Sequence, residues 1–143
     1  MFEQDYLMRQ LMAFFKALVN AAGSVEDKEH PDYRAAADML DEAITNATEM
    51  DGATLLSLAP ESIAQVMQVS GVDPNVTQFI ARSMLLESVY LEKSGEGGLA
   101  EVRDAQARAI ARQYGFDLPD DPSDFASITE GLEEAATRGG LRG

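Results

Sequence analysis

The chain has 143 residues, a formal net charge of −14 and no cysteine. A strongly acidic chain repels the phosphates of nucleic acids and of anionic membranes, so we expect no nucleic-acid and no membrane partner. Disulfides, thiolate metal sites and cysteine nucleophiles are excluded, which is compatible with a reducing compartment. Because Glu3 and Asp5 precede the first apolar stretch, the N-terminus is not typical of a signal peptide, and we predict a cytoplasmic protein.

The pattern of apolar residues indicates helices. Hydrophobic residues make up 45% of the chain and aromatic ones only 7%, and they recur at three- and four-residue steps without the alternation that is typical of strands. The length is that of one domain that can bury a core without cross-links. We therefore predict an all-α fold, a compact bundle of about five to six helices in residues 1–116.

The first helix is expected at about residues 3–22. Its apolar arc is unusually broad, because Met8, Met12 and Val19 widen a stripe that runs from Tyr6 to Leu18. Such a helix is either enclosed by neighbouring helices or shared with a second chain. Met8, Met12 and Phe15 are accordingly candidate partner-binding residues.

The second helix is predicted to begin at His30-Pro31-Asp32, with Pro31 in its first position, and to end near Gly52. Asp41 and Glu42 are expected to face water on this helix. His30 is the only histidine, and as a lone residue at a helix entrance it indicates a cap or plain surface rather than a catalytic group. A short apolar cluster, Leu55, Leu56 and Leu58, follows.

Two further helices are predicted because prolines occur at their starts and glycines after their ends. Pro60 opens the third helix and Gly71 follows its end, and Asp73-Pro74 opens the fourth. The fourth helix has too many apolar residues for one stripe, so we expect it to be the most enclosed.

Residues 94–98, with three glycines, are expected to reverse the chain, and Gly95 to end the fourth helix in a left-handed conformation. The fifth helix then runs to a C-terminal cap at Gly115. Four charged residues are predicted to lie largely on its outer side: Arg103, Asp104, Arg108 and Arg112.

After residue 116 the composition changes. Residues 117–143 are predicted to form an acidic, proline-containing linker and a weak, partly flexible C-terminal helix at about residues 123–137. Ser123 is a plausible cap for that helix. Its apolar positions share one side: Phe125, Ile128, Leu132 and Ala135 or Ala136.

The fourth and fifth helices together resemble a tetratricopeptide-type helical hairpin. Leu86 and Tyr90 stand four apart, as the Leu and Tyr of the first helix of such a repeat do, and a glycine-bearing turn and an alanine-rich helix follow. In this register Ala81, Met84 and Ser88 would face the inner side of the hairpin, and relatives of the hairpin commonly bind proteins. Glu87 stands where the family prefers a small residue and no 34-residue period continues, so we expect a compact bundle rather than a solenoid.

The opening residues 5–10, DYLMRQ, the leucine cluster at 55–58 and the hairpin also resemble, in this order, a family of small bacterial proteins without assigned function. This resemblance implies a fold without an activity.

Catalytic and metal-binding motifs are absent from the sequence. There is no G-x-S-x-G context for a nucleophile, no Gly-Lys-Ser/Thr phosphate loop and no Glu-x-x-His pair. The acidic linker lacks the spacing of a calcium loop. We expect no catalytic residue, no cofactor and no metal, and hence no enzyme.

The sequence leaves one leading hypothesis for the function and two alternatives. The first is a non-enzymatic helical module that binds a protein or peptide through its first helix or a groove between helices, with Met8, Met12, Phe15, Ala81, Met84 and Ser88 as candidate contacts. The second is a self-assembling homodimer with the first helix as its interface. A small-molecule binder is the third alternative.

Overall fold

The computed structural model describes residues 2–26, 29–48 and 55–119, with side chains from residue 9 onward. These ranges contain five helices and no strand: α1 (Phe2–Val25), α2 (Tyr33–Thr48), α4 (Pro60–Val69), α5 (Pro74–Lys93) and α6 (Gly97–Tyr114). The predicted all-α class is therefore confirmed. Residues 49–54 and the predicted helix at 123–137 lie outside the described residues.

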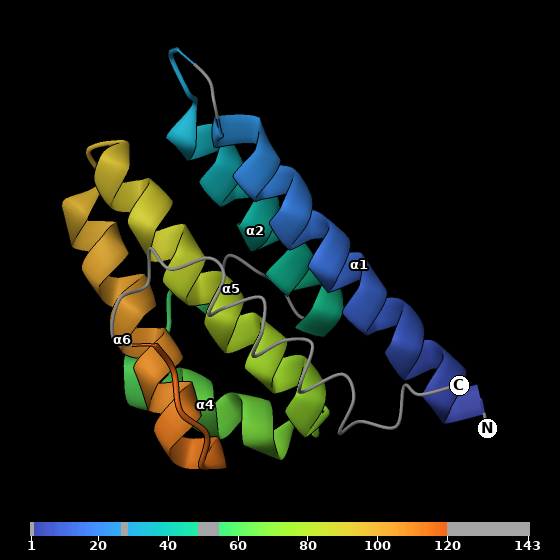
Figure 1. The fold of residues 1–143 in the computed structure, drawn as a ribbon. Helices are drawn as coiled ribbons and strands as arrows, with labels where there is room; N and C mark the ends of the chain where they lie inside the picture. The colour runs from blue at the N-terminus through green and yellow to red at the C-terminus, as the bar shows by residue number, and fades with distance from the viewer. Residues whose placement is uncertain (1, 27–28, 49–54, 120–143) are drawn as a thin grey trace.

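The helices pack around α5. Figure 1 shows α5 between the α1–α2 pair and α6, with α4 crossing the end of the bundle where α5 begins and α6 ends. The α5–α6 contact is the most extensive in the described structure, and α5 also contacts α2 and α1. Every residue of α5 from Val76 to Ser88 except Gln78 is buried, which confirms that the fourth predicted helix is the most enclosed.

Local sequence signals set the helix starts. The Asp73 carboxylate accepts a hydrogen bond from the backbone N–H of Asn75 at 2.8 Å, and Pro74 occupies the first turn of α5, where its missing N–H costs nothing. At α2 the prediction was wrong by two residues. Asp32 lies outside the helix and caps it, accepting from the N–H of Ala35 at 3.0 Å, so Pro31 precedes the cap.

Glycines end α5 and α6 as predicted. Gly95 has φ 90° and Gly115 has φ 76°, a left-handed conformation that costs a residue with a Cβ about 1 kcal/mol or more. The N–H of Gly115 donates to the carbonyl of Ala111 at 2.8 Å and closes the last turn of α6. The chain therefore reverses sharply after α5 and leaves α6 in a defined direction.

The core joins the helices through large apolar side chains. Phe14 of α1 and Phe79 of α5 pack with their ring centroids 6.0 Å apart, and both rings are buried. Leu55 and Leu56 of the predicted leucine cluster are also buried in this core. Residues 117–119 run back over the bundle, where the Arg82 and Arg108 guanidinium groups donate to the carbonyls of Asp117 (3.2 Å) and Pro119 (3.4 Å).

Candidate functional site

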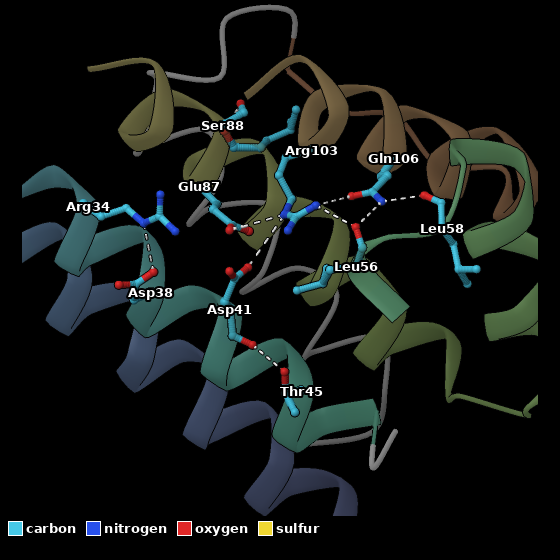
Figure 2. A network of polar contacts seen from close by, with 11 residues as sticks. Arg34, Asp38, Asp41, Thr45, Leu56, Leu58, Glu87, Ser88, Arg103 and Gln106 are labelled. Atoms are coloured by element: carbon cyan, nitrogen blue, oxygen red, sulfur yellow. Dashed lines mark hydrogen bonds and ion pairs between the residues drawn. The ribbon is translucent and has the colours of Figure 1, made fainter. Parts of the chain in front are cut away.

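A group of polar side chains is buried where α2, α5 and α6 meet. We call it the Glu87 cluster, and it consists of Asp41, Glu87, Arg103 and Gln106. Figure 2 shows the carboxyl groups of Asp41 and Glu87 directed at the same edge of the Arg103 guanidinium. Arg103 Nε lies 3.3 Å from Glu87 Oε2 and 3.7 Å from Asp41 Oδ1. One guanidinium thus faces two carboxyl groups from two helices.

The other side of the cluster holds the chain around the leucine cluster. Arg103 Nη1 donates to the backbone carbonyl of Leu56 at 2.9 Å and to Gln106 Oε1 at 3.0 Å. The Gln106 amide in turn donates to the carbonyls of Leu56 (3.0 Å) and Leu58 (2.9 Å). Because Leu56 is the last residue of a helical turn and Leu58 follows that turn, their carbonyls have no acceptor role within a continuing helix, and the cluster supplies their hydrogen bonds.

Glu87 is protonated in this environment. Its side chain is fully buried, and this burial, followed by the hydrogen bond to Asp41 and the charge of Asp41, raises the pKa of Glu87 from 4.5 to about 10. Arg103 acts in the opposite direction but does not offset the loss of hydration. A neutral Glu87 can donate its proton to an oxygen of Asp41.

The proton also accounts for two oxygens that otherwise lack a partner. Glu87 Oε1 and Asp41 Oδ1 are both buried and make no hydrogen bond to a heavy-atom donor. A buried unsatisfied acceptor costs roughly 1–3 kcal/mol, so a hydrogen bond between the two carboxyl groups removes that penalty. The arrangement is a structural joint: its polar groups face one another, with Glu87, Arg103 and Gln106 buried and Asp41 at the edge, its side chain 32% exposed.

Two sequence predictions about this cluster were wrong. Arg103 was placed on the outer side of its helix but is only 5% exposed, and Asp41 is half-buried instead of facing water. A signal was present in the sequence, because Glu87 is the one acidic residue within the apolar run 84–91 and a buried carboxyl requires a partner. The sequence did not identify that partner.

The six candidate contact residues separate into two groups. Ala81, Met84 and Ser88 lie inside the core, with exposures of 0%, 0% and 5%, so a partner does not reach them in this conformation. Met12 is 63% exposed and Phe15 is half-buried, both on α1. Met8 belongs to α1 as well, and its side chain lies outside the described part.

Apolar residues on one side of α1 follow the spacing of a coiled-coil interface, and Met12 and Val19 among them are exposed while Phe15 and Ala22 are half-buried. Met12, Phe15, Val19 and Ala22 follow Met8 at steps of 4, 3, 4 and 3, the spacing of a coiled-coil interface. We call this line the α1 seam. Met12 and Val19, at 63% and 45%, are among the most exposed large apolar side chains that the structure describes.

The position of the α1 seam follows from the register of the helix. The buried residues of α1 are Leu11, Phe14, Leu18 and Ala21. A groove of about 400 Å³ against α2 is lined by the residues that come directly before these four, namely Gln10, Ala13, Ala17 and Asn20. The residues that come directly after the four belong to the seam. Since one residue turns a helix by about 100°, the groove and the seam lie on opposite sides of the buried stripe. The α1 seam therefore faces away from α2.

The charges beside the seam are uniform in sign. Between residues 9 and 25 of α1 the ionisable side chains are Arg9 and Lys16, both basic and both exposed. They stand one residue after Met8 and Phe15, at positions that flank a coiled-coil interface. Glu3 and Asp5 precede them in the same helix and Arg9 already makes an interaction of its own, so this part of α1 is basic chiefly at Lys16.

The described residues offer no other evident site. Within them no three Asp, Glu or His side chains come together as metal ligands, and no helix is long and apolar enough to cross a membrane. A second groove, of about 420 Å³, lies between α5 and the start of α6, with Glu92, Glu101 and Asp104 on its walls. It contains no buried polar group directed at a ligand that is not already bonded, since the Ser88 hydroxyl donates to the carbonyl of Leu85 at 2.6 Å.

Comparisons with protein-family models, with curated proteins and with solved structures find no match for this chain. The resemblances of the α5–α6 pair to a tetratricopeptide-type hairpin, and of the element order to a small bacterial family, therefore stay predictions.

Proposed function

We propose that the protein is a non-enzymatic interaction module that binds an amphipathic, acidic helix along the α1 seam. The observation that carries this proposal is the exposure of Met12 and Val19, which stand seven residues apart on a helix whose other apolar stripe is already buried. A second helix with matching spacing would cover Met12 and Val19 as knobs and holes do in a coiled coil.

The charges specify the kind of helix. Because the exposed Lys16 flanks the seam, acidic residues beside the partner's apolar stripe gain attraction there and basic ones meet repulsion. A homodimer through α1 places Arg9 and Lys16 of two chains near one another in an antiparallel pairing. An antiparallel homodimer through α1 is thus less favoured than an acidic partner helix. The small-molecule alternative is supported only by the two open grooves.

The resemblance to a tetratricopeptide-type hairpin also implies protein binding, but through the inner face of the hairpin instead of α1. Its inner-face residues, Ala81 and Met84, are buried. For this reason we assign partner binding to Met12, Phe15 and the remainder of the α1 seam.

The test uses two synthetic peptides with the same leucine heptads, one with Glu and one with Lys at the flanking positions. Titrated into the full chain and followed by calorimetry, the Glu peptide is expected to bind at least tenfold more tightly than the Lys peptide, a difference of about 1.4 kcal/mol. Met12→Asp places a charge in the seam and is expected to abolish binding. Val69→Asp is the matched control, because Val69 is 88% exposed on α4, away from the seam.

Equal affinity for the two peptides, or binding that survives Met12→Asp, would refute the proposal. Light scattering during size exclusion addresses the alternative, since a stable dimer that Met12→Asp converts to monomer would favour self-assembly instead.

A further inference from the structure

We propose that the Glu87 cluster is a proton-controlled latch, and that loss of the Glu87 proton lets the α1–α2 pair separate from α5 while α4, α5 and α6 stay packed together. This inference does not depend on the partner proposed for the α1 seam. Three observations lead to it: the arrangement of the helices, the place of two carboxyl groups between them, and the hydrogen bonds on the far side of Arg103.

The described helices form two parts that meet at α5. The α1–α2 pair packs against α5, whereas α4 packs against α6 and α6 against α5 (Figure 1). Phe79 of α5 contacts Phe14 of α1, and Glu87, about two turns further along, faces Asp41 of α2. One side of α5 is therefore the surface on which the α1–α2 pair lies.

Two carboxyl groups face each other across this boundary. Asp41 from α2 and Arg103 from α6 are the charged groups that act on Glu87. With its proton, Glu87 bonds to Asp41 and holds the two parts together. Without it, two carboxylates share one guanidinium, at 3.3 Å and 3.7 Å from Arg103 Nε, and one negative charge has no counterion. Like charges repel strongly where little water screens them, so ionisation favours separation.

A second ion pair crosses the same boundary at its other end. The guanidinium of Arg34 on α2 lies 3.3 Å from the carboxylate of Glu96, which precedes α6. Both side chains are 49% exposed, so water screens the attraction. This pair therefore holds the two parts together only weakly.

The separation is expected at Asp41 and not at α4. The Asp41 side chain is 32% exposed, so water already reaches this edge of the cluster. On the other edge, Arg103 and Gln106 donate to the carbonyls of Leu56 and Leu58, and these hydrogen bonds do not involve α2. When α2 leaves, the connection to the segment before α4 therefore stays in place, and water can hydrate both carboxylates.

The opening is expected to depend on pH over a wide range. Burial raises the pKa of Glu87 to about 10 in the closed form, whereas hydration in the open form restores the usual value of 4.5. Between these two values the closed form binds a proton that the open form lacks. The open population therefore rises with pH, by up to about tenfold per pH unit.

The absence of cysteine allows the opening to be measured in the full chain. Ser83 lies one turn before Glu87 on the same side of α5 and is completely buried, so Ser83→Cys places a nearly isosteric thiol at the boundary. Ala64→Cys reports on α4, where this side chain is 3% exposed. Each thiol is reacted with a maleimide at several values between about pH 6 and pH 8, and its rate is divided by that of Val69→Cys to correct for thiol ionisation.

We expect the corrected rate for Ser83→Cys to rise by roughly tenfold per pH unit. The rise should disappear when Glu87→Gln is added, because an amide has no proton to lose. Glu92→Gln, exposed on the same helix, is the matched control and should leave the rise unchanged. The corrected rate for Ala64→Cys is expected to be at least about tenfold lower at every pH, because α4 stays packed on α6.

A rate for Ser83→Cys that does not change with pH, or a rise that survives Glu87→Gln, would overturn the inference. Equal corrected rates at positions 83 and 64 would also overturn it, because they would show that the whole chain unfolds and that no single boundary opens. Ala37→Cys, one turn before Asp41 on α2 and 1% exposed, repeats the measurement from the other side of the boundary and should give the same pH dependence.

Discussion

Glu87→Gln replaces a protonated, fully buried carboxyl group with an amide of nearly the same shape. The amide can keep both contacts of the cluster, donating to Asp41 and accepting from Arg103 Nε. It differs from glutamate in one respect, because it does not have to take up a proton when the chain folds.

The gain in stability from this substitution follows from the pKa of Glu87. The usual pKa of glutamate is 4.5, and burial in the folded chain raises it to about 10. Between these values the folded state binds a proton that the unfolded state lacks, so this group's contribution to stability falls as pH rises. Each pH unit in this window costs about 1.4 kcal/mol. From pH 4.5 to pH 7 the cost reaches about 3 kcal/mol.

We therefore expect Glu87→Gln to be more stable than wild type by about 3 kcal/mol at pH 7 and by almost nothing near pH 4.5. The assay is urea unfolding followed by circular dichroism at several pH values between about 5 and 9, with the difference in unfolding free energy plotted against pH. Subtracting wild type from variant removes the titrations that the two proteins share.

Glu92→Gln is the matched control, since Glu92 lies exposed near the end of the same helix. Its difference from wild type should not change with pH over this range. A difference for Glu87→Gln that is also independent of pH, or that favours wild type increasingly at high pH, would refute the protonated state. It would mean that Glu87 is ionised and forms an ion pair with Arg103.

Two further substitutions test the parts of the fold that hold the bundle together. Arg103→Met removes the guanidinium that bonds Glu87, Gln106 and the Leu56 carbonyl. Because buried acceptors lose their donor, this variant should be less stable by roughly 3–5 kcal/mol in urea unfolding. Arg112 is exposed in the last turn of α6, so Arg112→Met should change the stability by less than about 0.5 kcal/mol, and similar values for the two variants would contradict the buried cluster. Gly115→Ala forces a Cβ into a left-handed conformation and should lower the unfolding free energy by about 1–2 kcal/mol. Gly98 lies in the first turn of α6 with nothing within 4 Å of an added Cβ, so Gly98→Ala should raise the unfolding free energy by roughly 0.5–1 kcal/mol. A change of the same sign at both glycines would contradict the assigned cap.

Much of the local structure could be predicted because its signals lie within a few residues. The starts of α4 and α5 at Pro60 and Pro74, and the end of α6 before Gly115, follow from proline and glycine chemistry that needs no distant contact. The enclosure of α5 follows from its apolar residues on all sides. The broad apolar arc of α1 likewise predicted more apolar surface than one buried stripe uses, and Met12 is indeed 63% exposed.

The helical class, the ends of α4, α5 and α6 and the surplus apolar surface on α1 can be predicted from the sequence, because periodicity and capping are properties of consecutive residues. The inward turn of Arg103 to Glu87 and Asp41 depends on the tertiary structure, since a charge is buried only where packing brings it a partner that offsets its lost hydration. The tertiary structure also decided that Ala81 and Met84 are core residues and that the seam of Met12 and Val19 remains open, because the choice among several apolar faces depends on which neighbouring helix reaches each one.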